Sequence, residues 1–158
     1  MSANDSTSTS EQKPTLTTSL HPAMYYKGNA SEAMDFYAEH LDGKVDVKMT
    51  YSMARPVAEE FKNCIMHGVV SFRGNSIFFS DDVGGLGTVG ETFVGTNTYI
   101  NLVWNDLPAM TKSFEGLSAG GKIVAALQVQ PWGATYGAFV DKFDHPWSFL
   151  YQDPNASW

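Results

Sequence analysis

An internal repeat is the feature that most constrains the fold of this chain. Two helix-like segments, residues 29–41 and 105–117, carry identical residues at a constant spacing of 76 positions, and two later pairs follow at spacings of 69 and 70. Self-similarity of this kind indicates that one supersecondary unit occurs twice. The pairs are Asn29 and Asn105, Ala33 and Ala109, Met34 and Met110, Glu39 and Glu115, Leu41 and Leu117, Gly68 and Gly137, and Phe79 and Phe149.

The first copy has strand and helix patterns in the order βαβββ. Residues 44–51 alternate apolar and polar side chains, the period of a strand with one buried face. Residues 30–41 place apolar side chains on one helical stripe, which predicts a helix. Asn29 and Glu32 have the spacing of a capping box, and Gly43 follows the predicted end of the helix. The other strands are expected at residues 20–26, 64–72 and 76–81.

The second copy repeats this order. A helix is expected after Asn105, with Pro108 in its first turn, and strands are expected at residues 98–104, 122–129, 136–140 and 146–152. A four-stranded sheet with one helix cannot cover both of its faces, so the copies should share a concave surface. The sequence predicts an α+β fold: two tandem βαβββ modules forming a curled mixed sheet around a shared cup, with the helices outside. The predicted divisions are residues 1–19, a disordered tail; 20–82, the first module; 83–97, a Gly-rich linker or loop; 98–153, the second module; and 154–158, a C-terminal tail.

The first 19 residues differ in composition from the rest of the chain, because ten of them are Ser or Thr. Such a segment buries too little apolar surface to offset chain entropy, so we expect it to be disordered. It lacks the basic and apolar regions of a secretory signal, and no later stretch approaches the ~20 apolar residues of a membrane span. We therefore expect a soluble, cytoplasmic protein.

Charge and cysteine content exclude certain partners and certain kinds of site. The net charge is −7, and Lys and Arg do not cluster, so the field repels phosphate backbones and anionic lipids. We expect neither nucleic acid nor a membrane as a partner, and a neutral or cationic small molecule is easier to accommodate. The single cysteine, Cys64, excludes an internal disulfide and a thiolate-cluster metal site.

Three stretches resemble the vicinal oxygen chelate superfamily, whose members include glyoxalases, extradiol dioxygenases, bleomycin-type resistance proteins and fosfomycin-inactivating enzymes. They are GNASEAMDFYAEHLDGKV, MHGVVSFRGNSIFFSDD and QPWGATYGAFVDKFDHPWSF. The last is similar to the pattern Q-x-W-G-x-x-Y-G-x-x-x-D-P-F-G-H-x-W-S of the PhnB-like branch, with Lys142 in place of Pro and Asp144 in place of Gly. The resemblance covers about residues 20–152. It implies a homodimer with cups near the subunit interface.

The same resemblance implies a place for one divalent metal, held by four side chains, two from each module. Mapped through the strand and helix motifs, these positions are occupied by Pro22, Phe78, Thr98 and Ser148. None of the four offers an imidazole or a carboxylate. A shift of one position would introduce only one ligand, His21. We therefore expect neither the usual metal site nor a cofactor.

Other motifs have structural interpretations. Gly85–Gly90, with the sequence GLGTVG, fits a dinucleotide fingerprint, but no helical pattern follows it, so a flexible loop is predicted. Cys64 and His67 are three positions apart on a strand and face opposite sides, which argues against a nucleophile and base pair. Asp81 and Asp82 lie at a strand end, where a solvated turn is favoured over a carboxylate pair.

Aromatic residues dominate the final motif and predict a binding surface. Trp132 and Tyr136 are expected at the mouth of a pocket, Trp147 and Phe149 in the core, and Asp141–His145 in a hairpin turn. Aromatic walls stack on flat ligands and exclude water, so we expect a small, partly aromatic ligand in an apolar cup. The predicted ligand-binding residues are Met24, Tyr26, His67, Phe78, Ser80, Thr98, Ile100, Trp132, Tyr136, Ser148 and Leu150.

Two other functions stay open from the sequence. One is a metal-dependent lyase, isomerase or dioxygenase with a relocated metal site built from His67 and nearby acids or His21. The other is a structural or regulatory module that binds a partner through an apolar surface patch and has no enclosed cavity. The sequence assigns no catalytic residue.

Overall fold

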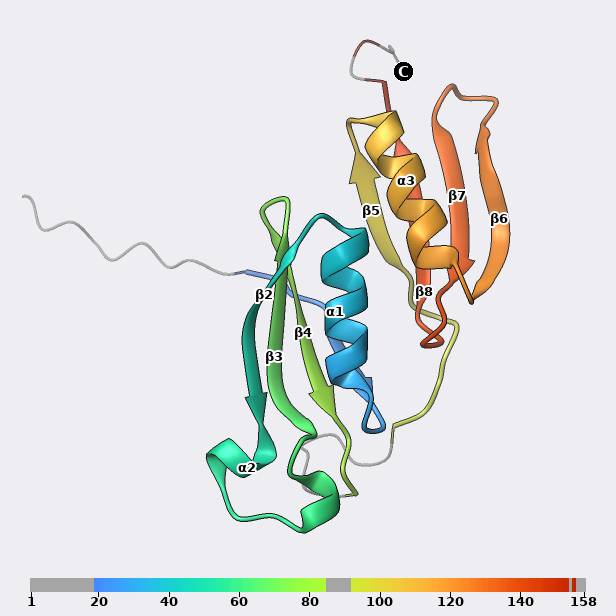
Figure 1. Ribbon diagram of the computed structural model, residues 1–158. Helices are drawn as coiled ribbons and strands as arrows, with labels where there is room; N and C mark the ends of the chain where they lie inside the picture. Colours follow the sequence, from blue (N-terminus) through green and yellow to red (C-terminus); the bar gives the residue numbers. More distant parts are fainter. Residues whose placement is uncertain (1–18, 85–91, 154, 156–158) are drawn as a thin grey trace, which may run out of the picture.

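The computed structural model describes residues 19–84, 92–153 and 155, and within them the chain forms two βαβββ modules (Figure 1). The first contains β1 (Ala23–Tyr26), α1 (Ala30–His40), β2 (Lys44–Thr50), α2 (Tyr51–Ala54), the 3-10 turn η1 (Glu59–Phe61), β3 (Ile65–Phe72) and β4 (Asn75–Asp81). The second contains β5 (Ile100–Trp104), α3 (Leu107–Ser118), β6 (Lys122–Val129), β7 (Thr135–Val140) and β8 (Pro146–Tyr151). The predicted order of elements is confirmed. The motif Gly85–Gly90 and residues 1–18 of the predicted tail lie outside the described residues.

Each module forms one four-stranded mixed sheet. The strand orders are β1-β4-β3-β2 and β5-β8-β7-β6, so the first and last strands of each module pair in parallel and the other pairs are antiparallel. The helix after the first strand carries the chain across the sheet to its far edge. The α+β fold class and the two-module organisation are therefore confirmed.

The repeated glycines and phenylalanines are cross-strand partners. Gly68 pairs with Phe79 in the first sheet, and Gly137 pairs with Phe149 in the second. A Cβ atom at Gly68 would lie 2.5 Å from Sδ of Met34 in α1. A Cβ atom at Gly137 would lie 2.8 Å from a ring carbon of Phe114 in α3. The glycine thus lets the helix approach the sheet closely, and this packing accounts for the sequence repeat.

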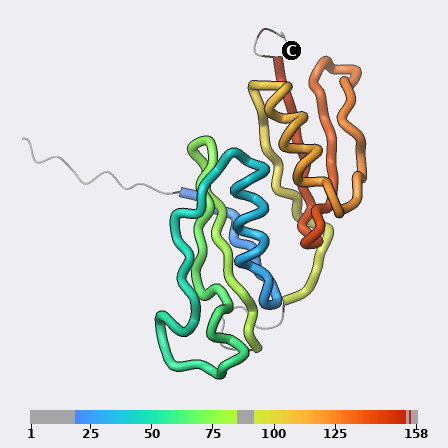
Figure 2. Tube along the Cα trace, in the orientation of Figure 1, coloured from blue at the N-terminus to red at the C-terminus, as the bar shows by residue number. Residues whose placement is uncertain are grey.

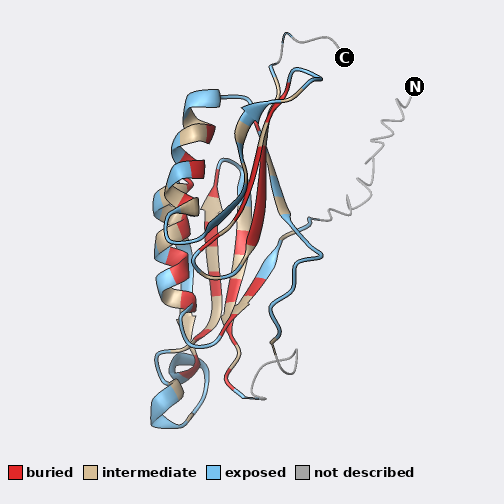
Figure 3. Cartoon of the chain, turned by 90° about the vertical axis from the view of Figure 1, so that its right-hand side faces the viewer, coloured by how far each residue is buried: buried red, intermediate tan, exposed pale blue. Residues whose placement is uncertain are grey.

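Both helices lie on the same side of the two sheets. Figure 3 shows α1 and α3 stacked along one side, with buried residues where helices and strands face each other. Trp147 and Phe149 are fully buried there, as the sequence predicted. Neither α1 nor α3 covers the opposite side of the sheets, and we call that side the open face. Within the described ranges, no helix is long and apolar enough to cross a membrane.

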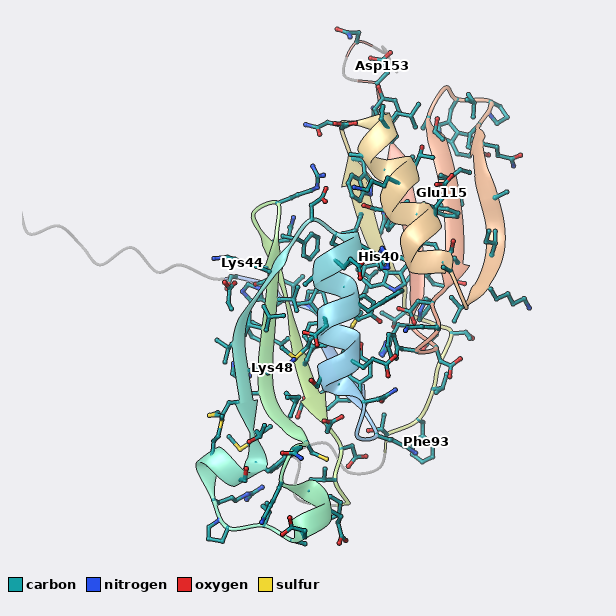
Figure 4. The ribbon with its side chains drawn as sticks, viewed as in Figure 1. His40, Lys44, Lys48, Phe93, Glu115 and Asp153 are labelled. Carbon is teal, nitrogen blue, oxygen red and sulfur yellow. The ribbon has the colours of Figure 1, made fainter. Side chains whose placement is uncertain are left out.

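The two modules pack through their helices and the final hairpin turn. Tyr37 in α1 donates a hydrogen bond of 2.5 Å to Asp141, and Lys142 forms an ion pair of 3.0 Å with Glu32 in α1. His40, at the end of α1, packs against α3 (Figure 4). The trace in Figure 2 shows the chain from residue 92 running from the first module to the second. The substitution of Lys142 into the family motif therefore adds a contact between modules.

The two helices begin differently. Asp106 caps α3, because its side chain accepts a hydrogen bond of 2.9 Å from the amide of Ala109. The capping box predicted for α1 is wrong, since Asn29 makes no side-chain cap. Asp81 takes that role from the end of β4, where its carboxylate accepts from the amides of Gly28 and Ala30 at 2.8 and 3.0 Å. The solvated turn predicted for Asp81 is also wrong, because the residue is 1% exposed.

Candidate ligand-binding cleft

The open face of the first sheet carries a cleft of about 410 Å³, here named the first cleft. Phe78 and Ser80 alternate along β4 with residues buried against α1, and their β1 partners are Ala23 and Tyr25. These four residues therefore share the open face. Among the described residues, the lining is made by Ala23, Met24, Tyr25, Tyr51, Arg55, Met66, His67, Phe78, Phe79 and Ser80.

Two imidazoles flank the ring of Phe78. His21 stacks on it with ring centroids 4.8 Å apart, and His67 meets it edge-on at 5.5 Å. The His21 ring is fixed by hydrogen bonds of 2.7 Å to Ser76 and 2.8 Å to Ser19. Phe78 is partly exposed in the cleft, so its ring presents a flat apolar surface to a bound molecule.

The short helix α2 closes one end of the first cleft. Tyr51 is 1% exposed, and its hydroxyl donates a hydrogen bond of 3.1 Å to the carbonyl of Asp81. The guanidinium of Arg55 lies 5.4 Å from the centre of the Tyr51 ring. The Asp81 carboxylate is turned into the core, where it also accepts from the amide of Ile65 at 2.7 Å. The described lining therefore includes Arg55 and His67 but no acidic residue.

A second cleft, of about 420 Å³, lies where the modules meet. It shares Ala23, Met24 and Tyr25 with the first cleft, so β1 forms a common wall. Phe93, which is 79% exposed, stands at its edge (Figure 4). Burial lowers the pKa of the His145 imidazole, while the charges of Asp141 and Asp144 oppose this change. The other lining residues are Pro22, Thr92, Val94, Gly95, Asn97, Thr98, Ile100, Phe143, Asp144, His145 and Pro146.

Some of the predicted binding residues meet in these clefts. Met24, His67, Phe78 and Ser80 line the first cleft, and Met24, Thr98 and Ile100 line the second. Met24 is only 3% exposed, however, because it lies on the helix side of β1 opposite Phe79.

Two predicted residues point mainly into the core. The hydroxyl of Tyr26 lies 3.2 Å from that of Tyr37, and the predicted position of Tyr26 in the cup is wrong. Ile100 is the strand partner of Trp147 and packs against the core of the second module.

The other predicted residues lie elsewhere in the second module. Tyr136 and Leu150 are strand partners, Ser148 pairs with Ala138, and all these residues alternate with those buried against α3. Trp132 is 59% exposed in the turn before β7. Neither cleft, as the described residues define it, includes Trp132, Tyr136, Ser148 or Leu150.

Sequence reasoning missed several residues of the first cleft. Tyr25 was missed because Met24 and Tyr26 were predicted to face the cup, whereas β1 turns these two residues toward the helix and Tyr25 toward the cleft. Arg55 and Met66 were missed because one follows α2 in an irregular connection and the other lies beside a break in the β2 and β3 register. No local pattern in the sequence singles them out.

The residues at the expected metal positions do not fit a metal. Pro22 and Phe78 are adjacent, with the amide of Phe78 donating to the carbonyl of Pro22 at 2.9 Å, but neither side chain is a ligand. In the part of the chain that the structure describes, no group of three or more His, Cys, Asp or Glu residues could hold a metal ion. The described lining of the first cleft offers aromatic rings and hydrogen-bonding groups.

The chain has sequence relatives among bacterial proteins. It is 31% identical over 124 residues to Mb0911c, an uncharacterised protein of Mycobacterium bovis, with 76% of this chain and 74% of the relative covered. It is 28% identical over 141 residues to YjdN of Escherichia coli, with 81% and 91% covered. No protein-family model matches the chain.

Solved structures share its fold. The TM-score is 0.77 with PA1353 of Pseudomonas aeruginosa, at 22% identity, covering 87% of this chain and 99% of the other. It is 0.70 with a PhnB protein of Bacillus cereus, at 19% identity, covering 85% and 100%. It is 0.60 with a glyoxylase/bleomycin resistance protein/dioxygenase domain of Frankia sp. EAN1pec, at 19% identity, covering 90% and 96%. The predicted superfamily fold is confirmed.

Proposed function

We propose that this chain, which belongs to the family of Mb0911c and has the vicinal oxygen chelate fold, binds a small, partly aromatic molecule in its first cleft without a metal. The observation that carries the proposal is the partly exposed ring of Phe78, which contacts the rings of His21 and His67 and lines a cleft of about 410 Å³. This volume is within the range of small-molecule sites, roughly 300–1,000 Å³.

The composition of the lining supports an aromatic ligand. Tyr25 and Phe78 contribute partly exposed rings, and Met66 contributes an adaptable thioether that packs well against aromatic rings. Each well-oriented ring contact contributes about 0.5–1.5 kcal/mol beyond the burial of apolar area. Ser80 adds a hydroxyl, which donates to the carbonyl of Met66 at 3.1 Å and has acceptor capacity left over.

The test uses 2-naphthol as an uncharged aromatic probe, with binding followed by saturation-transfer NMR. We expect saturable binding, a loss of about five- to tenfold in affinity in the F78L variant, and no new product by mass spectrometry. The matched control is Y136L, which removes a ring from the open face of the second sheet and should leave the affinity unchanged. A loss in Y136L alone would move the site to the second module, and turnover would contradict a purely binding role.

The second candidate is an enzyme of the same fold with a relocated metal site. The observation that favours it is that His67 lines the first cleft and that His21 contacts the same ring, Phe78. Metal analysis of dialysed, tag-free protein distinguishes the candidates. Stoichiometric zinc, iron, nickel or manganese that is lost in an H21A/H67A variant would support the enzyme and contradict the metal-free proposal.

We also propose that the chain forms a homodimer through the second module. Large apolar side chains are exposed at both edges of its sheet, on β5 and β6, and burial of such side chains is a usual basis for association. A light-scattering mass near twice 17.3 kDa is expected, whereas a monomeric mass at micromolar concentration would contradict the proposal. The exposed residues are Val103, Ile123, Val124, Val129 and Trp132, at 67%, 53%, 54%, 72% and 59% exposure.

A further inference from the structure

The second cleft, of about 420 Å³, has a lining of different chemistry from the first. Its walls come from the start of β1, from the segment before β5 and from the final hairpin turn. The turn contributes the carboxylate of Asp144, and the segment before β5 contributes the side-chain oxygens of Asn97 and Thr98. The rings of Phe93 and Phe143 belong to the same lining. Hydrogen-bond acceptors together with aromatic rings suit a positively charged group.

Asp144 occupies a backbone position that most residues avoid. Its φ of 67° is in the left-handed region, which Gly, Asn and Asp adopt more readily than other residues. The PhnB-like motif has Gly here, and Gly would complete the same turn without a side chain. Asp144 is exposed, and within the described ranges no hydrogen bond or ion pair occupies its carboxylate. The presence of Asp in place of Gly therefore adds an anionic group to the second cleft.

Aromatic rings in the lining can contact a cation through their faces. Phe93 is 79% exposed at the edge of the second cleft. Phe143 already has an ammonium group near its ring, since Nζ of Lys142 lies 5.0 Å from the ring centre. That ammonium pairs with Glu32 at 3.0 Å, and the described lining of the second cleft does not include Lys142. The ring of Phe93 is therefore open to a bound molecule.

His145 does not repel a cation from this cleft at neutral or higher pH. Burial lowers the pKa of its imidazole, against the opposing charges of Asp141 and Asp144, so the ring is mainly neutral at about pH 7.5. A neutral imidazole has one nitrogen that accepts a hydrogen bond. The net charge of −7 also raises the concentration of small cations near the surface.

We propose that the second cleft is a binding site for a small organic ammonium ion, with its charged group at Asp144 and its carbon skeleton against Phe93. This site is separate from that of the proposed function. The two clefts share Ala23, Met24 and Tyr25, but neither Asp144 nor Phe93 is in the described lining of the first. The inference also agrees with the preference for a neutral or cationic small molecule that the net charge predicts.

The test compares cyclohexylammonium with cyclohexanol, which has the same ring but no charge. Neither probe is aromatic, so neither is a ligand expected of the first cleft. Each is titrated at low salt and about pH 7.5 into the full chain, isotope-labelled for NMR, so that amide shifts give both the affinity and the location. The variants are D144N, which keeps the shape of the side chain, and D144G, which introduces the residue of the family motif. Both replacements suit the turn, because Asn and Gly adopt positive φ.

E115Q is the matched control for charge. Glu115 is an exposed carboxylate on α3 and is not in the described lining of the second cleft (Figure 4). F78L is the control for the first cleft, since Phe78 lines that cleft alone among the two. Urea denaturation confirms that each variant is folded.

We expect cyclohexylammonium to bind the natural chain about fivefold more tightly than cyclohexanol. This preference should approach one at about 0.5 M NaCl, because Asp144 is exposed and its charge is screened. D144N and D144G should both abolish the preference, whereas E115Q and F78L should retain it. F93L should weaken binding of the ammonium ion by about threefold.

The amides that shift should include those of Thr98 and His145, which line the second cleft. Equal affinity of the two probes for the natural chain, an unchanged preference in D144N, or shifts confined to the first cleft would each overturn the inference. Absence of binding by both probes would overturn it as well. Because 2-naphthol and F78L report on the first cleft, each of these results leaves the proposed function to its own test.

Discussion

The hydroxyl of Tyr37 lies 2.5 Å from Oδ2 of Asp141, and this hydrogen bond joins the helix of the first module to the final turn of the second. The same carboxylate accepts from Nε1 of Trp147 at 2.8 Å and from the amides of Phe143 and His145 at 2.9 and 3.0 Å. Asp141 is 2% exposed, so these donors replace all of its hydration. The carboxylate therefore depends on contributions from both modules.

Removal of the Tyr37 hydroxyl should destabilise the fold. In the Y37F variant, Asp141 loses its one donor from the first module and stays buried, so we expect the free energy of unfolding to fall by about 1–3 kcal/mol. Urea denaturation followed by tryptophan fluorescence measures the change. Y99F, at a tyrosine that is 40% exposed, is the control and should unfold like the natural chain. Coincident curves for Y37F and the natural chain would contradict the role assigned to this contact.

The two buried tyrosines should make the fold sensitive to alkali. Burial raises the pKa of Tyr37 far above its usual range, with further increases from Tyr26 and Asp141. Burial also raises the pKa of Tyr26, although its hydrogen bond with Tyr37 acts in the opposite direction. Below about pH 10, both hydroxyls are neutral in the folded and unfolded chain, so their contribution to stability is complete. Above that pH, the unfolded chain releases protons that the folded chain keeps, and stability falls as the pH rises.

Urea denaturation between pH 8 and pH 11 tests this dependence. The loss of stability above about pH 10 should be shallower in Y26F/Y37F than in the natural chain, because the variant has two fewer groups with raised pKa values. Y99F again serves as the control. The same slope in both chains would show that other groups cause the alkaline loss.

The two helix starts should respond differently to truncation. D106A removes the side chain that accepts from the amide of Ala109, and a loss of about 1 kcal/mol is expected. N29A occupies the equivalent position of the first module but removes no side-chain cap, so its effect should stay below about 0.5 kcal/mol. Chemical denaturation of the two variants gives the comparison. An equal loss in both would mean that Asn29 does cap α1 in solution.

Two glycines should differ in their tolerance of alanine. At Gly121, a Cβ atom would overlap the carbonyl oxygen of Val140 and lie 2.8 Å from the carbonyl carbon of Asp141, so the backbone itself must move. At Gly68, the close atoms are Sδ and Cε of Met34, at 2.5 and 2.6 Å, and a flexible side chain can turn away. We expect G121A to cost about 3 kcal/mol and G68A about 1 kcal/mol. The reverse order in thermal or urea unfolding would contradict the packing described for these sites.

The order of elements could be predicted because strand alternation and helical stripes are local signals. Strand β6 has the bounds expected from the sequence, Lys122–Val129. The faces of β1 could not be predicted in the same way. Its four residues, Ala23–Tyr26, are all apolar or aromatic and contain no polar alternation that distinguishes the two sides. The position of the cleft residues on that strand depends on pairing with β4, a contact between residues about 55 positions apart.

The role of Asp81 shows a second limit of local reasoning. A polar residue at a strand end is usually solvated, and Asn29 with Glu32 has the spacing of a capping box. The fold instead brings Asp81 to the first turn of α1. There its carboxylate accepts hydrogen bonds from backbone amides at the start of the helix, the role expected of a capping residue close in sequence. Arg55 is a second example, since it lines the first cleft and lies over the ring of Tyr51, and no sequence pattern marks that position.

Helix and sheet approach each other closely at Gly68 and Gly137, so the side-chain volume allowed at each glycine depends on the volume of the residues packed against it. Met34 fills the volume that a side chain at Gly68 would need, and Phe114 and Leu127 together do the same at Gly137. A strand side chain larger than a methyl group would therefore need a smaller residue at position 34 in the first half, and smaller residues at both 114 and 127 in the second. Large residues at positions 68 and 137 should therefore be found only together with smaller residues at these neighbouring positions.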